Sequence, residues 1–289
     1  MEIEVYTMDV FAVETNGGNP AGVVLDANSL SKDDMQKIAK KVGLSETAFV
    51  QNSDNADYKV TFFTPDGEVD LCGHATVAVF YLLANKGIIQ TGEYTQETKA
   101  GILKVECKND GSIYMNQCNP EFYEKLDKKE IAETLNINID DIMDDLPIQI
   151  VSTGLKDILI PIKSLETLYK IKPNFDKISR VSKKYNVTGY HIFTLETKFE
   201  SIAHCRNFAP LYGIPEEAAT GTSNGALSCY LYNYKIILEK NIKNLVFEQG
   251  YSMKKPSNIL IDLITCDNKI IEVKVGGAAL NIEKKKIKL

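Results

Sequence analysis

Apolar and polar positions follow two different periods in the first half of the chain, and each period predicts its own kind of element. A two-residue alternation or a short apolar run predicts strands, at residues 3–13, 22–25, 45–51 and 58–64. Residues 31–43 instead place apolar side chains at helical spacing between Ser31 and Gly43, which predicts an amphipathic helix with a start and a stop signal. Residues 71–84 are apolar on nearly every face, so a helix there is expected to be buried all round.

The second half of the chain repeats this order of features. An aromatic residue, an aromatic-proline turn and a glycine before an apolar helix occur as Phe49, Phe63-Thr64-Pro65 and Gly73, and again as Phe193, Phe208-Ala209-Pro210 and Gly221. The interval between counterparts is nearly constant, which favours a duplicated domain; two copies are too few for a solenoid. Coincidence between turn-rich segments is the alternative, because turn residues recur in all folds.

Strand patterns dominate the second half as well, at residues 148–153, 158–162, 190–195, 201–206, 245–249, 258–265 and 270–275. Many strands around one buried helix per half predict an α+β fold of two pseudo-symmetric lobes, each a barrel-like sheet around its helix. We place the N-terminal lobe at residues 1–118, with a last strand at 278–289 returning to it, and the C-terminal lobe at 119–277. The charged stretch 119–146 is expected to connect the two lobes.

Composition narrows the class of protein. The 289 residues carry a formal net charge of −6, which argues against nucleic acid as a partner because phosphate binding needs clustered basic residues. The lysine run 284–288 is interpreted as a solvated end. Six cysteines lie scattered without a CxxC pair, which favours free thiols in a reducing compartment. With no signal-peptide pattern and no apolar stretch long enough to span a bilayer, we expect a soluble, cytoplasmic protein without a membrane partner.

Each predicted buried helix begins at a turn of small residues, Cys72-Gly73-His74 in the first half and Thr220-Gly221-Thr222 in the second. Unpaired backbone N–H groups and the positive end of the helix dipole lie at such a start. If the duplication brings both starts to one cleft, the cleft would receive a carboxylate. Ordinary capping by Thr220 or Thr222 is the alternative for the second helix.

Several short stretches are distinctive as a set: Asn19-Pro20-Ala21-Gly22-Val23, Ser45-Glu46-Thr47-Ala48-Phe49-Val50, Phe63-Thr64-Pro65, Cys72-Gly73-His74-Ala75-Thr76, Arg206 with Phe208-Ala209-Pro210, Ala219-Thr220-Gly221-Thr222 and Val275-Gly276-Gly277-Ala278. Together, and in this order, they resemble the PhzF family of phenazine-biosynthesis proteins over nearly the whole chain. The resemblance implies a two-lobed fold like that of diaminopimelate epimerase, commonly a homodimer. It also implies proton movement in a small cyclic acid without metal or cofactor, as in the isomerisation of trans-2,3-dihydro-3-hydroxyanthranilate.

Glu46 and His74 are the predicted catalytic residues. Glu46 stands at the start of an apolar strand, where burial would raise its pKa towards neutrality, as a carboxyl that takes and returns a proton requires. His74 stands at a helix start that would depress its pKa, and the resemblance implies that it hydrogen-bonds the substrate or helps to carry its proton. A solvated glutamate and a structural histidine are the alternatives. His191 and His204 are interpreted as structural.

The resemblance also implies substrate contacts at Ser45, Gly73, Glu217, Gly221 and Thr222. The sequence departs from the family pattern at one of them, because Glu217-Ala218 stands where the family usually has Asp-Pro. The longer side chain of Glu217 and the looser turn after it leave that contact and the identity of the substrate open. We expect a small anionic substrate, either cyclic or resembling an amino acid.

Two other functions stay open from the sequence. One is an amino-acid epimerase or racemase of related fold, in which two opposed acids flank one carbon. A two-thiol version is disfavoured, since Cys72 precedes Gly73 but Thr220 precedes Gly221, and a threonine does not form a thiolate. The other is a small-molecule binder that keeps the scaffold without catalysis.

Overall fold

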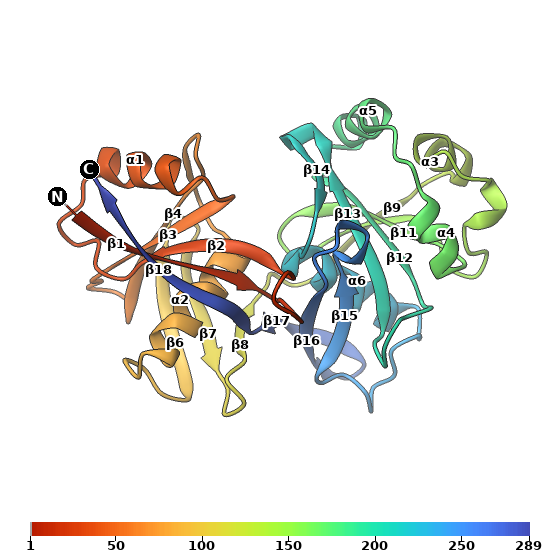
Figure 1. The fold of residues 1–289 in the computed structure, drawn as a ribbon. Helices are drawn as coiled ribbons and strands as arrows, with labels where there is room; N and C mark the ends of the chain where they lie inside the picture. Colours follow the sequence, from red (N-terminus) through yellow and green to blue (C-terminus); the bar gives the residue numbers. More distant parts are fainter. Residues whose placement is uncertain (1) are drawn as a thin grey trace. The chain divides into compact units, whose positions relative to one another are not determined.

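A computed structural model describes residues 2–289, and the chain folds as two compact units (Figure 1). Unit 1 comprises the chain up to Asn116 together with Gly276–Leu289, and unit 2 comprises Gln117–Val275. Each unit has its own strands and its own central helix, so each is described by itself.

Unit 1 is built mainly of strands that surround one helix. In chain order its elements are β1 (Glu2–Val10), β2 (Asn19–Val24), α1 (Lys32–Val42), β3 (Glu46–Gln51), β4 (Tyr58–Phe63), β5 (Glu68–Val69), α2 (Gly73–Asn85), β6 (Gly92–Thr98), β7 (Gly101–Cys107), β8 (Ile113–Asn116) and β18 (Ala279–Lys288). Strand β2 runs parallel to β3 and antiparallel to β1, and β18 pairs antiparallel with β1. The C-terminal lysines therefore lie on an exposed strand, where Lys284 contacts Glu4 and Lys286 contacts Glu2.

Unit 2 has the same mixture of strands and a central helix, with further helices outside. Its elements are β9 (Glu121–Lys125), α3 (Lys128–Leu135), β10 (Gln149–Ser152), β11 (Lys156–Pro161), α4 (Leu165–Lys170), α5 (Phe175–Tyr185), β12 (Gly189–Thr194), β13 (Ala203–Ala209), β14 (Ile214–Glu217), α6 (Gly221–Asn233), β15 (Leu245–Gln249), β16 (Ser257–Cys266) and β17 (Lys269–Gly277). The last two residues of β17 belong to unit 1.

The strand pairings of the two units match one for one. Strands β2 and β3 are parallel, β3–β4 and β4–β5 are antiparallel, and β4–β6 is parallel. Strands β11 and β12 are parallel, β12–β13 and β13–β14 are antiparallel, and β13–β15 is parallel. Helices α2 and α6 each have 13 residues and each begin at a glycine. The internal topology therefore bears out the duplication that the sequence pattern predicts.

The register corrects one pair of the predicted counterparts. Phe49 pairs with Thr61, whereas Phe193 pairs with Cys205. Because Phe63 and Phe208 are counterparts, Ile192 and not Phe193 occupies the position of Phe49. Matching one aromatic residue to another shifted the alignment by one, and a shift of one residue exchanges the two faces of a strand.

Both central helices are buried on nearly every side, as an apolar sequence requires. Helix α2 packs against β1, β2, β3, β7, β8 and β18, and α6 packs against β10, β11 and β16 (Figure 1). Among the α-helices of residues 2–289, α1, α3, α4 and α5 begin at Ser31, Asp127, Ser164 and Asn174, whose side chains accept backbone N–H groups. The N-cap residues of α2 and α6, Cys72 and Thr220, make no such bond. Thr220 thus stands at the N-cap position without capping through its side chain, and the alternative of ordinary capping by Thr220 is not borne out.

The stretch 119–146 is also not the connection that its charges suggest. It holds β9 and α3, and Ile131, Leu135 and Ile142 are fully buried in a core that includes Ile178 of α5 and Tyr190 of β12. Charged residues fill the outer face of α3, so the overall composition hides an apolar stripe at helical spacing. The chain folds this stretch into unit 2.

The fold has the predicted α+β class, with one buried helix inside the strands of each unit. No helix within residues 2–289 has the length and apolar character needed to cross a bilayer.

A close backbone contact at Gly189 predicts a large stability loss on substitution. A Cβ atom there would lie 2.0 Å from the carbonyl oxygen of Phe208, so Gly189→Ala must displace backbone. We expect a loss of about 3 kcal/mol in the free energy of unfolding, measured by urea denaturation. Gly67→Ala is the control, because a Cβ at Gly67 meets nothing within 4 Å. Equal stabilities for the two variants would contradict this packing.

Candidate active site

Glu46 and His74, the two predicted catalytic residues, lie together in unit 1. Glu46 begins β3 and His74 is the second residue of α2. The Nε2 atom of His74 lies 3.1 Å from Oε2 of Glu46, and the side chains are 8% and 21% exposed. The duplicated fold explains the meeting, because α2 packs directly against β3 and its first turn reaches the strand's first residue.

Two further side chains complete the surroundings of the imidazole. The Sγ atom of Cys72 lies 3.4 Å from Nδ1 of His74, and the Oγ atom of Ser45 lies 3.5 Å from Nε2. The Ser45 hydroxyl also donates to the carbonyl of Pro20. Three segments of unit 1 therefore meet here: the start of β2, the start of β3 and the start of α2.

The pKa values of the pair shift opposite to the sequence expectation. Burial raises the pKa of Glu46, but the hydrogen bond and charge of His74 outweigh it, so the pKa of Glu46 is lowered. Burial lowers the pKa of His74, but the Cys72 sulfur and the Glu46 carboxylate outweigh it, so the pKa of His74 is raised well above its ordinary value. The expectation of a raised pKa for Glu46 and a depressed one for His74 was wrong, because each treated its residue alone.

Both shifts favour a carboxylate on Glu46 and a proton on His74. Burial also raises the pKa of the Cys72 thiol, which disfavours a thiolate in this site. The Oε2 atom of Glu46 is buried, and within the described chain it accepts no aligned hydrogen bond. A carboxylate next to an imidazolium can take a proton at one atom and supply one at another.

The start of α2 is open beside this pair. Cys72 gives the helix no side-chain cap, so N–H groups of the first turn keep their donor capacity. A Cβ atom on Gly73 would meet only the sulfur of Met115 within 4 Å, at 3.6 Å. Packing does not demand glycine there, and its absence of a side chain leaves the backbone accessible to an anion.

The same cluster offers a carboxylate, a thiol and an imidazole to a metal ion. One ligand atom each from Glu46, Cys72 and His74 lies within 4.8 Å of the others. These are donor types that Zn²⁺ accepts. The prediction that the protein works without a metal or cofactor stays a prediction.

The predicted contacts of the second half lie together in unit 2. Glu217 ends β14, and Gly221 and Thr222 are the first two residues of α6. The Thr220 hydroxyl donates to Oε2 of Glu217 over 3.1 Å, and the carbonyl of Thr222 accepts from the hydroxyl of Thr153. Glu217, Gly221 and Thr222 are partly exposed. The substrate contacts proposed for them, and for Ser45 and Gly73, stay predictions.

Sequence reasoning missed a buried polar group below the start of α6. Asp157 is only 2% exposed, and the Ser223 hydroxyl donates to its Oδ2 atom over 2.5 Å. Burial raises the pKa of Asp157 to about 7, against the lowering effect of Ser223. A charged residue at the head of the apolar run Ile158–Ile162 was the signal available in the sequence.

The two remaining histidines are buried and hydrogen-bonded in unit 2. His204 contacts Glu248 over 2.6 Å, and Glu248 also accepts the backbone N–H groups of Lys198 and Phe199. Burial lowers the pKa of His191 to about 4. Both fit the structural role expected for them: His204 helps to hold a loop, and His191 is a neutral member of a polar network.

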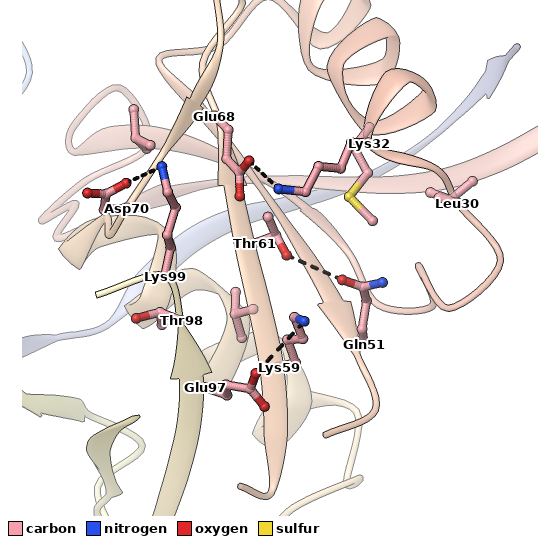
Figure 2. Close-up of a pocket in the computed structure, with 13 residues that line it drawn as sticks. Leu30, Lys32, Gln51, Lys59, Thr61, Glu68, Asp70, Glu97, Thr98 and Lys99 are labelled. Carbon is pink, nitrogen blue, oxygen red and sulfur yellow. Dashed lines mark hydrogen bonds and ion pairs between the residues drawn. The ribbon is translucent and has the colours of Figure 1, made fainter. Parts of the chain in front are cut away.

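A separate hollow of about 410 Å³ lies in unit 1 but carries no comparable chemistry (Figure 2). The charged side chains in it pair with one another: Lys32 with Glu68, Lys99 with Asp70 and Lys59 with Glu97. Figure 2 shows these three pairs at separate places around the hollow. Paired, largely exposed charges are not poised for proton transfer.

The ion pair makes a direct prediction for histidine titration. Replacing Glu46 by Gln removes the negative charge beside the imidazole, so we expect the pKa of His74 to fall by about 1–3 units. A pH titration of the imidazole signals by NMR would measure it. His191, whose pKa is about 4 in the other unit, is the internal control and should not change. A His74 signal that titrates at the same pH in both proteins would refute the pair.

Comparison with known proteins agrees with this architecture. The chain is 38% identical to an uncharacterised isomerase of Clostridium acetobutylicum, over 98% of this chain and 97% of that protein. It also resembles the crystal structure of a PhzF-family phenazine biosynthesis protein of Bacillus anthracis, with a TM-score of 0.91, 34% identity and full coverage of both chains.

A more distant likeness concerns the fold alone. A hydroxyproline epimerase of Agrobacterium vitis matches with a TM-score of 0.62 at 10% identity, over 99% of this chain and 91% of that one. The α+β duplicated fold predicted from the sequence is therefore confirmed. The family model described as phenazine biosynthesis-like protein, PhzC-PhzF, matches residues 8–285, and the chain belongs to this family, whose curated relatives include proteins named as isomerases.

Proposed function

We propose that the protein is an isomerase that moves a proton within a small cyclic carboxylic acid, with Glu46 as the general acid and base. The observation that carries the proposal is the contact between Glu46 and His74, whose Oε2 and Nε2 atoms lie 3.1 Å apart at the start of α2. A group that removes a carbon-bound proton must be a base before the substrate arrives, and a carboxylate with a lowered pKa is one.

The proposed reaction needs two proton transfers and no other reactant. Oε2 of Glu46 takes a proton from a carbon next to a conjugated system, and the electron pair of the broken C–H bond enters that system. The proton then returns from Glu46 to a different carbon, while the imidazolium of His74 hydrogen-bonds the substrate and keeps the carboxylate in place. The uncapped start of α2 at Gly73 is the proposed receptor for the substrate carboxylate.

The named reaction of the family, isomerisation of trans-2,3-dihydro-3-hydroxyanthranilate, is the nearest analogue for the substrate class. We propose Ser45, Glu217, Gly221 and Thr222 as further substrate contacts. A cytoplasmic location, a homodimer and the lack of nucleic-acid or membrane partners are part of the same proposal. A thiolate-based epimerase is disfavoured further, because burial raises the pKa of Cys72.

Exchange of substrate protons with solvent tests the chemistry without knowledge of the product. Incubation of cyclic and amino-acid-like carboxylic acids in deuterated water should give deuterium incorporation with the native protein, read by mass spectrometry. Glu46→Gln keeps the size of the side chain but removes the base, so we expect the exchange rate to fall by about 10³-fold or more, while ligand binding persists.

Glu97→Gln is the matched control, since Glu97 pairs with Lys59 in the separate hollow; its exchange rate should equal that of the native protein. A native protein that binds an acid of the panel and exchanges none of its protons would be a binder, and the isomerase proposal would fail. Exchange that survives Glu46→Gln would remove Glu46 from the mechanism.

Metal dependence is a second test of the same site. Dialysis against a chelator should leave the exchange rate unchanged, whereas added Zn²⁺ should inhibit by binding Glu46, Cys72 and His74. Cys72→Ser should weaken that inhibition at least tenfold, because it removes a thiolate ligand. Cys107→Ser, which changes a buried cysteine at the end of β7, should not. Loss of exchange on chelation would show that the enzyme needs a metal.

A further inference from the structure

The two units differ sharply in one matched row of residues. In unit 1, Ala48, Phe62 and Val69 face one another across β3, β4 and β5. In unit 2 the same row across β12, β13 and β14 is His191, Asn207 and Glu217. The duplicated fold is thus stable with an apolar row, so the fold itself does not require the polar one.

The second difference is where the carboxyl near the central helix comes from. Glu46 pairs with Ala21 of the neighbouring parallel strand, and the matching pair in unit 2 is Gly189 with Asp157. A side chain at Gly189 would force the backbone to move, as its Cβ would lie 2.0 Å from a backbone oxygen. Unit 2 therefore places its carboxyl on the other strand of the pair, at Asp157.

Hydrogen bonds join these polar residues into one chain with a fixed direction. The Asn207 amide donates to the Ser223 hydroxyl over 3.1 Å, and Ser223 donates to Asp157. The other N–H of Asn207 faces Nδ1 of His191 over 3.3 Å, and Nε2 of His191 faces the Asn224 oxygen over 3.3 Å. The neutral tautomer that donates through Nε2 satisfies both contacts.

The same chain continues to the end of β14. Asn224 donates to Gln249 over 2.7 Å, Gln249 donates to the Thr220 hydroxyl over 3.0 Å, and Thr220 donates to Glu217 over 3.1 Å. Every donor therefore points outward from Asn207, and each branch ends at a carboxyl group, Asp157 or Glu217. Side-chain networks of this kind hold their members in one orientation.

We propose that Asp157 and Asn207 are positioning residues, which hold the carboxylate of Glu217 and the first turn of α6 through this chain of hydrogen bonds. The proposal rests on the proposed function only in taking Glu217 as a substrate contact. Unit 1 shows that an apolar row would be compatible with the fold, and a buried polar network is costly wherever a partner is lost. In this proposal the function of the network is to orient Glu217.

The groups that act on the Asp157 carboxyl come from three neighbouring elements. Glu217 on β14 acts on it as a like charge, Ser223 on α6 and the backbone of Gly189 on β12 hydrogen-bond it, and the neighbouring His191 is neutral. Ionisation of Asp157 should therefore affect the titration of Glu217, and ionisation of Glu217 should affect that of Asp157.

Carboxyl NMR tests the proposal without any substrate. In protein labelled with ¹³C at the glutamate carboxyls, the Glu217 signal, assigned with Glu217→Gln, should show a second inflection near pH 7 as Asp157 ionises. Asp157→Asn should remove that inflection, and Ser223→Ala and Asn207→Leu should shift the Glu217 signal by disrupting the network. Asp262→Asn, a buried aspartate on β16 that binds the backbone of Asn244, should leave the signal unchanged.

Solvent-deuterium exchange supplies the second readout. Asp157→Asn and Ser223→Ala should each lower the exchange rate about tenfold, as expected when a contact residue is misplaced, and Asp262→Asn should not. A native protein without exchange would sink the proposed function, and the NMR result would then decide the network alone. A Glu217 signal that titrates identically in the native protein, Asp157→Asn and Ser223→Ala would overturn the positioning role. If one of these variants does not fold, the comparison of the other variant with the native protein decides the role.

Discussion

Everything in each unit is organised around a helix that must be buried on all sides. An apolar helix inside a set of strands buries its side chains against them. The N–H groups of its first turn, however, have no hydrogen-bond acceptor within the helix. The α-helices outside the two cores use serine, aspartate or asparagine caps. Helices α2 and α6 carry no side-chain cap, so each unit has a helix start with donor capacity for a ligand.

In unit 1 that start lies next to a buried ion pair, and the pair sets the chemistry. Burial alone would have made Glu46 a weak acid and His74 a neutral base. Contact with His74 reverses the shift of Glu46, and contact with Cys72 and Glu46 reverses that of His74, because opposite charges and hydrogen bonds stabilise the charged forms where water is scarce. Both shifts favour the charged forms of the pair, and a carboxylate form of Glu46 suits a base that acts on a carbon-bound proton.

Duplication gave the two units one topology and left their interiors free to diverge. The row that is Ala48, Phe62 and Val69 in unit 1 corresponds to His191, Asn207 and Glu217 in unit 2. The apolar row needs only volume and shape, whereas the polar row needs every partner in place. A polar row of this kind is useful where the orientation of one of its members matters. In the proposal above that member is Glu217, at the end of β14.

The sequence by itself determined the elements with strong local signals: the capped helix α1, the two apolar helices, most strands and the duplication, together with Glu46 and His74 as a candidate pair. It did not reveal α3 and α5 among charged residues, and it misaligned Phe49 with Phe193 by one position. Only the tertiary structure decided the direction of the pKa shifts and the network from Asp157 to Glu217. The physical reason is that propensity and periodicity are local, whereas charge coupling and hydrogen bonds join residues that the sequence keeps far apart.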